Sequence, residues 1–376
     1  MNVPVRAAIA PVDHDPFAGF DLARAVPTTE SQREVWLADQ YSPEASLAYN
    51  ESISLNLRGV LDITALQRSL DALVMRHEAL RASIEPGGKQ LHIAAAGSLP
   101  IVLIDVSELS TVAQAQRLET ERARAVETPF ALDTGPLIRA TLIRRAALDH
   151  VLLLTAHHIV CDGWSFAVLI GDLAAIYSAE SSGNIATPPA AAQFGDYAID
   201  ESRAQAAGTP DADERYWVSQ FEHPAPALEL PADRGRPAVR AYSSLREDST
   251  LEVELVAQLK RFAARNGSTL FGVLMAGFAA LMARLSAQAE VVVGVPSAGQ
   301  SSTDAPSLVG HCVNLLPLRL STDQNQTGPQ LIRATQQALF DAFEHRRCTF
   351  GTLIRKLQME RDPSRPPLVS VNPVSG

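Results

Sequence analysis

One stretch of the chain, VLLLTAHHIVCDGWS at residues 151–165, indicates both the fold and the site. Its apolar run, residues 151–155, predicts a buried strand. Ser165 is a good N-cap residue, and the apolar residues after it recur at helical spacing, which predicts a helix. Two histidines, a carboxylate and a glycine therefore lie in the turn between a strand and a helix N-terminus. Such a turn can present a base to a substrate, and its backbone N–H groups can meet developing negative charge.

The two adjacent histidines are predicted to have different roles. Successive strand residues point to opposite faces, so one of His157 and His158 faces a cavity while the other packs inward. This geometry argues against both chelating one metal ion, and no further cluster of cysteine or histidine supports a metal site. We therefore expect no metal. The alternative interpretation is two structural histidines, with Asp162 capping the helix.

The pattern His157-His158-x-x-x-Asp162-Gly163 resembles the active-site signature of the condensation domains of nonribosomal peptide synthetases. Many acyltransferases carry a single His-x-x-x-Asp-Gly motif, but here other segments agree with that family in order and spacing. They are 28–37 (TTESQREVWL), 76–81 (RHEALR), 194–198 (FGDYA), 309–319 (VGHCVNLLPLR) and 361–368 (RDPSRPPL). The resemblance covers residues 26–370, nearly the whole chain.

The pattern along the chain predicts an α/β fold in two similar halves. Strands are expected over 50–58, 137–144, 151–155, 291–295 and 312–320, and helices over 31–40, 62–77, 111–127, 252–266, 268–285 and 330–344. Strands and helices recur in both halves without strict alternation, which fits two α/β sandwiches. The resemblance implies two chloramphenicol-acetyltransferase-like lobes in a V-shaped pseudo-dimer, with the active site in the tunnel between them.

The predicted division is a linker over residues 1–25, an N-terminal lobe carrying the histidine motif over 26–185, and a C-terminal lobe over 186–376. Residues 1–25 are rich in Ala, Pro and Asp without a period, and two prolines within 186–192 suit a crossover. Because members of the resembled family continue beyond the segment at 361–368, we expect the C-terminal lobe to be truncated.

Composition indicates a cytoplasmic enzyme. The chain has 376 residues, enough for two lobes, and a formal net charge of −10, so neither nucleic acid nor an anionic membrane is an expected partner. Its 3 cysteines are widely spaced and predict neither a disulfide framework nor a zinc site. The N-terminus lacks a secretory signal pattern, and the longest uncharged apolar stretch, 270–283, is too short to span a bilayer.

The resemblance implies an amide-forming acyltransferase. The amine of an acceptor aminoacyl thioester attacks the thioester carbonyl of a donor acyl or peptidyl group. Both substrates are held on phosphopantetheine arms of donor and acceptor carrier proteins, so neighbouring synthetase modules are expected partners. A thioester is already activated, and no bound cofactor is implied. Alignment of the two thioesters can contribute roughly 7–11 kcal/mol, and a positioned base about 10²–10⁴-fold.

By this resemblance, His158 is the base or the residue that positions the amine, and His157 supports the loop. Asp162 is expected to form a structural ion pair with Arg81, since buried guanidinium groups are seldom unpaired. Gly163 permits close approach of the thioester, with its N–H facing the oxyanion; alternatively it supplies a positive φ in the turn.

Three further residues are expected along the substrate tunnel: Trp164, Ser165 and Asn314. Trp164 also suits a packing anchor, and Asn314 also suits a cap at a strand end. Gln300 stands where many members of the resembled family have arginine, which puts an auxiliary ion pair to the active-site loop in doubt.

Four other functions fit parts of the pattern. A coenzyme A-dependent acyltransferase shares the fold and the His-x-x-x-Asp-Gly motif, and an epimerase domain shares the doubled histidine. A cysteine hydrolase would use Cys161 with His158, although a cysteine in such a turn is more often an apolar filler. A non-catalytic module that recruits a carrier or another partner is the alternative outside enzymes.

Overall fold

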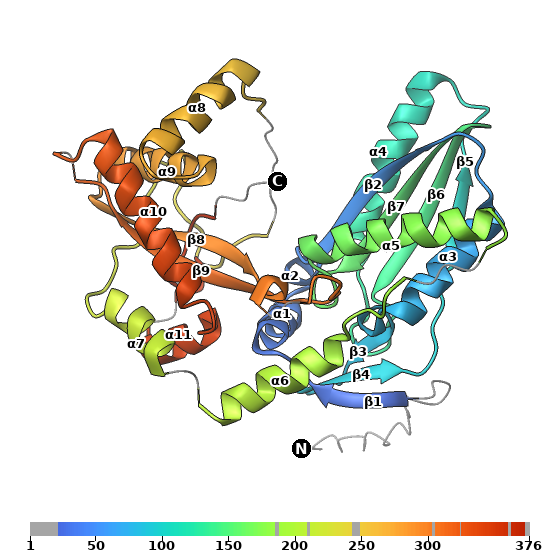
Figure 1. Cartoon of the computed structure of the whole chain (residues 1–376), viewed down its shortest axis with the longest axis horizontal. Coiled ribbons are helices and arrows are strands. Elements are labelled where there is room, and N and C mark those ends of the chain that lie inside the picture. The colour runs from blue at the N-terminus through green and yellow to red at the C-terminus, as the bar shows by residue number, and fades with distance from the viewer. Residues whose placement is uncertain are drawn as a thin grey trace, which may run out of the picture.

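The computed structural model describes residues 22–184, 188–208, 211–242, 249–302, 305–323, 325–359 and 362–372. These residues form two lobes that diverge as a V, with the chain crossing between them near its point (Figure 1). The predicted boundary between residues 185 and 186 lies outside the described residues, as do residues 1–21 of the predicted linker.

The first lobe is built on a four-stranded sheet of order β2-β7-β6-β5. The strands are β2 (Asn50–Arg58), β5 (Ile101–Asp105), β6 (Ile138–Ala146) and β7 (Asp149–His157). Only the β5–β6 pair is parallel. The helices over this sheet are α3 (Ile63–Arg76), α4 (Thr111–Glu127) and α5 (Gly163–Ser181).

The continuous apolar run of β7 follows from burial on both faces of the sheet. Leu152 and Leu154 pack into the main core with α3 and α5, whereas Val151 and Leu153 pack on the opposite face with Leu118 of α4. Alternate side chains of a strand point to opposite faces, so a strand covered on both sides is apolar at every position. In Figure 1 α3 and α5 lie on one side of this sheet and α4 on the other.

A smaller sheet, of order β1-β4-β3, closes the lower end of the first lobe. It comprises β1 (Leu22–Pro27), β3 (Ala82–Ile84) and β4 (Gln90–Ala94), next to α1 (Glu30–Tyr41), α2 (Pro43–Leu47) and the 3₁₀ turn η1 (Glu78–Arg81). The expected linker is therefore wrong at its end, because residues 22–25 pair with β4 as part of β1.

The second lobe has a two-stranded antiparallel sheet of β8 (Glu290–Ala298) and β9 (Val313–Ser321). Its helices are α7 (Asp211–Gln220), α8 (Val253–Arg265), α9 (Leu270–Ser286), α10 (Gly328–Glu344) and α11 (Phe350–Leu357). The two halves are thus less alike than their patterns suggest, because the described part of the second lobe pairs two strands where the main sheet of the first lobe pairs four.

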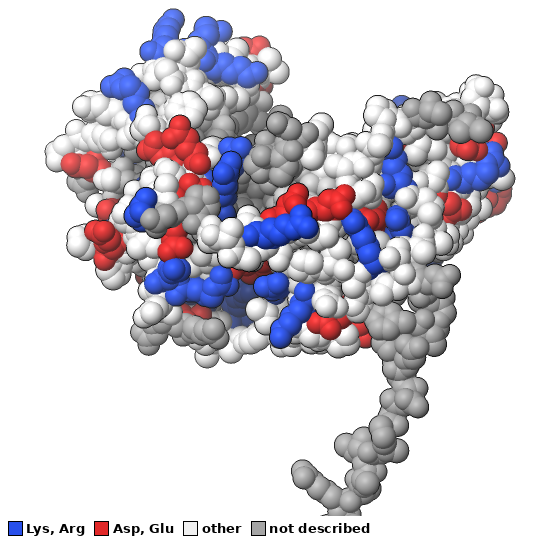
Figure 2. Space-filling model, turned by 60° about the horizontal axis from the view of Figure 1, so that its bottom comes forward, with Lys and Arg blue, Asp and Glu red and all other residues white. Residues whose placement is uncertain are grey.

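No single described helix is long and apolar enough to cross a membrane; α8 and α9 meet that criterion only as a pair, bent by 97° at their break. On the underside of the molecule, arginine and lysine side chains lie among aspartate and glutamate side chains (Figure 2).

Several contacts between described residues bind the lobes together, and two of them involve α6 (Phe194–Ala206) and α11. From the second half of the chain, Phe194 at the start of α6 and residues 308, 309 and 312 are buried in the core of the first lobe. The other of these contacts is at Glu30 of α1, whose carboxylate accepts hydrogen bonds from Thr349 and Thr352 and pairs with Arg355 of α11. The segment that carries residues 308–312 is also the one that reaches the histidine motif.

The expected elements are confirmed, with ends that shift by a few residues. One correction concerns the helix after the motif: it begins at Gly163 with Asp162 as its N-cap, two residues before the predicted start at Ser165. The elements without a prediction are short or polar: β1, β3, β4, β5, α2, α6, α7 and α11.

Substituting Gly310 should loosen the contact between the lobes. A Cβ at this position would overlap the ring of Phe194, so we expect Gly310→Ala to lower the free energy of unfolding by about 1–3 kcal/mol. The measurement is urea unfolding. Gly328→Ala is the control, because its Cβ meets nothing within 4 Å, and its effect should stay within about 0.5 kcal/mol. Equal effects of the two substitutions would contradict the overlap.

Candidate functional site

Asp162 lies at the centre of the site and is fully buried. Its Oδ1 accepts hydrogen bonds from the backbone N–H of Ser165 at 2.8 Å and lies 2.7 Å from that residue's hydroxyl, as expected of an N-cap. Its Oδ2 accepts from Gln300 Nε2 at 2.9 Å and from the backbone N–H of Cys312 at 3.1 Å. Asp162 thereby joins α5 of the first lobe to two separate points of the second.

The predicted ion pair between Asp162 and Arg81 is wrong. The Arg81 guanidinium donates to the backbone carbonyls of Ala94, Val74 and Met75, at 2.7, 3.1 and 3.1 Å. It therefore fastens the end of α3 to β4. Neutral donors occupy both oxygens of Asp162, and Gln300 provides one of them from the position where the resemblance leads one to expect arginine.

His157 ends β7 and is fully buried, in agreement with a supporting role. Its Nδ1 accepts a hydrogen bond of 3.3 Å from the backbone N–H of Ile159, which places the ring proton on Nε2. Burial, with a smaller contribution from the neighbouring His158, lowers the pKa of His157 to about 4. This side chain is therefore a neutral brace inside the turn.

His158 follows directly and points the other way. Its backbone N–H donates to the carbonyl of Tyr49 at 2.8 Å, while its side chain stays about one-third exposed. Its Nδ1 lies 3.0 Å from Nδ1 of His311, in the segment from the second lobe, and the rings meet edge to face at 87°. Its Nε2 lies 3.8 Å from Oε2 of Glu51 on β2. Because Nδ1 is engaged, Nε2 is the nitrogen that can meet a substrate.

The electrostatics around His158 come from two neighbours. Burial is the main cause that raises the pKa of Glu51; His158 lowers it and Asp162 raises it further. Burial also lowers the pKa of His311 well below its usual value, aided by the two motif histidines. The buried ring of His311 is therefore neutral at physiological pH.

Gly163 is the first residue of α5 and is exposed. The alternative expectation, that this glycine supplies a positive φ in the turn, is wrong, because Gly163 does not have a positive φ. A Cβ there would meet nothing within 4 Å, which leaves open space beside a backbone N–H of the first helical turn. Trp164 is 39 % exposed, and its indole donates to the carbonyl of Pro306 at 3.1 Å, which fits the packing anchor.

Two residues expected along the tunnel, Ser165 and Asn314, have side chains that are hydrogen-bonded to backbone groups. The Ser165 hydroxyl is fully buried and lies 3.0 Å from both the carbonyl and the N–H of Gly310, in addition to its contact with Asp162. The amide of Asn314 donates to the carbonyls of Arg346 and Cys348, and its oxygen accepts from the N–H of Phe350. Both side chains are engaged in holding backbone segments together.

Three side chains at this site have contacts that no sequence pattern predicts. The sequence gives no sign that Glu51 or His311 contacts His158, and Gln300 differs from the resembled family only by replacing an arginine. His311 lies within the segment 309–319 that carries part of the resemblance, so its position was the available signal. Its partner is 153 residues away along the chain.

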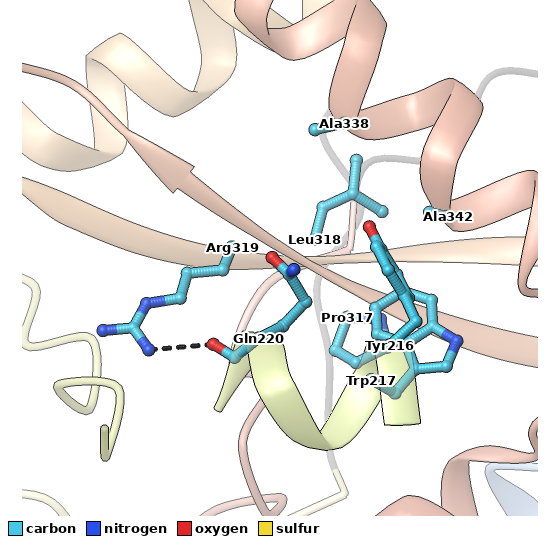
Figure 3. Close-up of a pocket in the computed structure, with 8 residues that line it drawn as sticks. All are labelled: Tyr216, Trp217, Gln220, Pro317, Leu318, Arg319, Ala338 and Ala342. Carbon is cyan, nitrogen blue, oxygen red and sulfur yellow. Dashed lines mark hydrogen bonds between the residues drawn. The ribbon is translucent and has the colours of Figure 1, made fainter. Parts of the chain in front are cut away.

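The second lobe has a small cavity away from this site. A cavity between α7, α10 and β9 has a volume of about 10 Å³, room for roughly one water (Figure 3). It is lined by Tyr216, Trp217, Gln220, Pro317, Leu318, Arg319, Ala338 and Ala342.

In the described ranges no three potential metal ligands of the His, Cys, Asp or Glu type gather at one place. Cys161 is fully buried, and burial raises the pKa of its thiol, which disfavours a nucleophilic thiolate.

Comparison with known proteins identifies relatives of the whole described chain. A family model described as Condensation domain matches residues 23–373. One of the subunits of the linear gramicidin synthase of Brevibacillus parabrevis is 35 % identical over 354 residues, which is 92 % of this chain and 4 % of that protein. One of the subunits of the plipastatin synthase of Bacillus subtilis (strain 168) is 33 % identical over 345 residues, 91 % of this chain and 13 % of that protein. The chain thus spans a small part of these relatives.

Solved structures share the fold. The X-domain in complex with OxyB from teicoplanin biosynthesis has a TM-score of 0.80 at 26 % identity, over 94 % of this chain and 78 % of that one. The first condensation domain of the CDA synthetase has a TM-score of 0.77 at 26 % identity, over 93 % and 80 %. These likenesses confirm the expected pair of chloramphenicol-acetyltransferase-like lobes.

The partners of Asp162 can be tested by double-mutant cycles in urea unfolding. Asp162→Ala strands buried donors, at about 1–3 kcal/mol each, and removes a helix cap. Combined with Gln300→Leu, it should show a coupling of about 0.5–3 kcal/mol. Combined with Arg81→Ala, the two effects should add within about 0.5 kcal/mol, because the side chains share no partner. If Asp162→Ala couples to Arg81→Ala and not to Gln300→Leu, the predicted ion pair between Asp162 and Arg81 would be supported instead.

The buried His157 should make the fold sensitive to acid. Its pKa is about 4 in the folded chain and near 6.5 in an unfolded one, so the unfolded chain takes up the proton first as the pH falls. The stability that His157 contributes is complete above about pH 6.5 and is lost toward pH 4, by at most roughly 1.4 kcal/mol per pH unit.

The check is the free energy of unfolding at pH 7.5 and pH 5. His157→Asn keeps an acceptor for the N–H of Ile159 and does not titrate, so it should show a smaller loss on acidification than the wild type. The exposed His223, replaced by asparagine, serves as control and should leave the loss unchanged. An unchanged loss in His157→Asn would contradict the assignment.

Proposed function

The chain belongs to the condensation-domain family of nonribosomal peptide synthetases, and on that premise we propose that it catalyses amide bond formation. The amine of an acceptor aminoacyl thioester would attack the thioester carbonyl of a donor acyl or peptidyl group. The observation that carries the proposal is His158, whose Nδ1 is held by the second lobe while Nε2 stays open to a substrate.

The chemistry needs one proton to be moved. As the C–N bond forms, the amine passes a proton to Nε2 of His158, and Glu51 at 3.8 Å favours the resulting imidazolium. The tetrahedral oxyanion is met by the N–H of Gly163, beside which there is open space at the N-terminus of α5. When the C–S bond breaks, the imidazolium returns the proton to the departing thiolate.

The partners follow from the substrates. Donor and acceptor would arrive as thioesters on the phosphopantetheine arms of two carrier proteins. This chain spans only 4–13 % of the two synthase subunits that it resembles, which leaves room in them for many other domains. A thioester needs no further activation, so we propose no resident cofactor.

A second candidate, recruitment of a partner protein, has one observation in its favour. The X-domain from teicoplanin biosynthesis, of the same fold, was solved in complex with OxyB. Against it stands the complete set of His158, Asp162 and Gly163 here, with the histidine open to substrate.

The deciding experiment is condensation between loaded carrier proteins, followed by intact mass. We expect His158→Ala to reduce the rate by about 10²–10⁴-fold at neutral pH, with little change in melting temperature because the side chain is partly exposed. His157→Ala should lower the melting temperature more. His223→Ala, at an exposed histidine, is the control for activity.

Three outcomes would contradict the proposal. Equal rates for the wild type and His158→Ala would remove the role of His158. Transfer from free coenzyme A thioesters but not from carriers would favour a coenzyme A-dependent acyltransferase. Binding of carriers without any product would favour recruitment.

A further inference from the structure

We propose that His311 of the second lobe is a positioning residue for His158. Its Nδ1 accepts a hydrogen bond from the Nδ1–H of His158, and this keeps the lone pair of His158 on Nε2, where the acceptor amine arrives. The inference rests on the proposed function for the role of the amine, but the hydrogen bond itself can be tested without any turnover.

The geometry requires a shared proton. The two Nδ1 atoms are 3.0 Å apart, a normal hydrogen-bond distance, and the ring centroids are 4.8 Å apart in an edge-to-face arrangement. One nitrogen must donate and the other accept, because two N–H groups or two lone pairs would repel each other. The state of His311 thus decides which nitrogen of His158 carries the lone pair.

The direction of the hydrogen bond follows from the reaction. His311 is only 7 % exposed, and burial keeps it neutral. After His158 has taken a proton from the amine, both of its nitrogens are donors, so Nδ1 of His311 must be the acceptor. Before the transfer, the same direction leaves the lone pair on Nε2. The opposite direction would place the lone pair of His158 on Nδ1, facing His311, and leave no base for the substrate.

His311 is held in place by its backbone neighbours. Gly310 is bonded to Ser165 through both its N–H and its carbonyl, and the N–H of Cys312 donates to Asp162. The residues on either side of His311 are therefore fixed to the start of α5, which follows the turn that carries His158. The charged or titratable groups around the pair are Glu51, Asp162 and His157.

The direct test is the tautomer of His158 in the full chain, measured by ¹⁵N NMR of labelled histidine at neutral pH and assigned with His158→Gln. We expect a protonated Nδ1 and an unprotonated Nε2 on His158. A neutral His158 with its proton on Nε2 would overturn the proposal, whether or not the protein shows condensation activity.

The kinetic test compares two replacements of His311. Leucine cannot accept a hydrogen bond, so His311→Leu should lower kcat by about 10–100-fold, part of what a positioned base contributes, with little change in KM. Asparagine can place an oxygen near the position of Nδ1, so His311→Asn should recover most of that loss. His311→Leu should also move the acidic limb of the pH–rate profile, which loss of packing alone would not do.

Ser307→Ala is the matched control, because Ser307 lies four residues before His311 in the same segment. Its hydroxyl accepts a hydrogen bond from the N–H of Ala192, and no contact with His158 is seen. It should leave the pH profile unchanged. An unchanged kcat in His311→Leu, or an equal loss in the leucine and asparagine variants, would overturn the proposal. If His311→Leu does not fold, the NMR tautomer and His311→Asn decide. A wild type with the expected tautomer but no product would refute the proposed function and leave the role of His311 standing.

Discussion

The site depends on one buried carboxylate that is satisfied entirely by neutral donors. Asp162 caps α5 and also receives Gln300 and the N–H of Cys312 from the second lobe. A buried charge must be compensated, and hydrogen bonds from the N–H groups of Ser165 and Cys312 and from the amide of Gln300, at the positive end of a helix dipole, can do this without a cation. Because these donors come from both lobes, the carboxylate is satisfied only when the lobes are together. The segment that reaches it carries His311 to His158.

The main elements around the site could be predicted from local pattern, whereas the contacts between lobes could not. The apolar run of β7, the caps and the helical periods are properties of neighbouring residues. The sequence predicts Arg81 as the partner of Asp162, because a buried carboxylate is often paired with a cation. In the structure the amide of Gln300 donates to this carboxylate instead. Sequence spacing does not predict contacts between residues so far apart: Asp162 and Gln300 are separated by 138 residues, and His158 and His311 by 153.

The side chains of Ser165 and Asn314 are hydrogen-bonded to backbone groups for the same reason. A polar residue beside the histidine motif suits substrate binding, yet the motif also needs polar groups to join its backbone segments. Ser165 joins α5 to Gly310, and Asn314 joins β9 to the turn before α11. Hydrogen bonds of this kind become visible only when segments far apart in sequence are placed side by side.

The contacts of His158 and Asp162 across the lobes also bear on recombination between relatives. A chimaera that takes residues 22–184 from one synthetase and the rest from another would inherit the complete histidine motif, yet could lose the donor at residue 300 and the ring at residue 311. The compatible unit of exchange is therefore the motif together with the segment from Gln300 to Cys312. Fusion points for building new synthetases from this chain should keep those two stretches from the same parent.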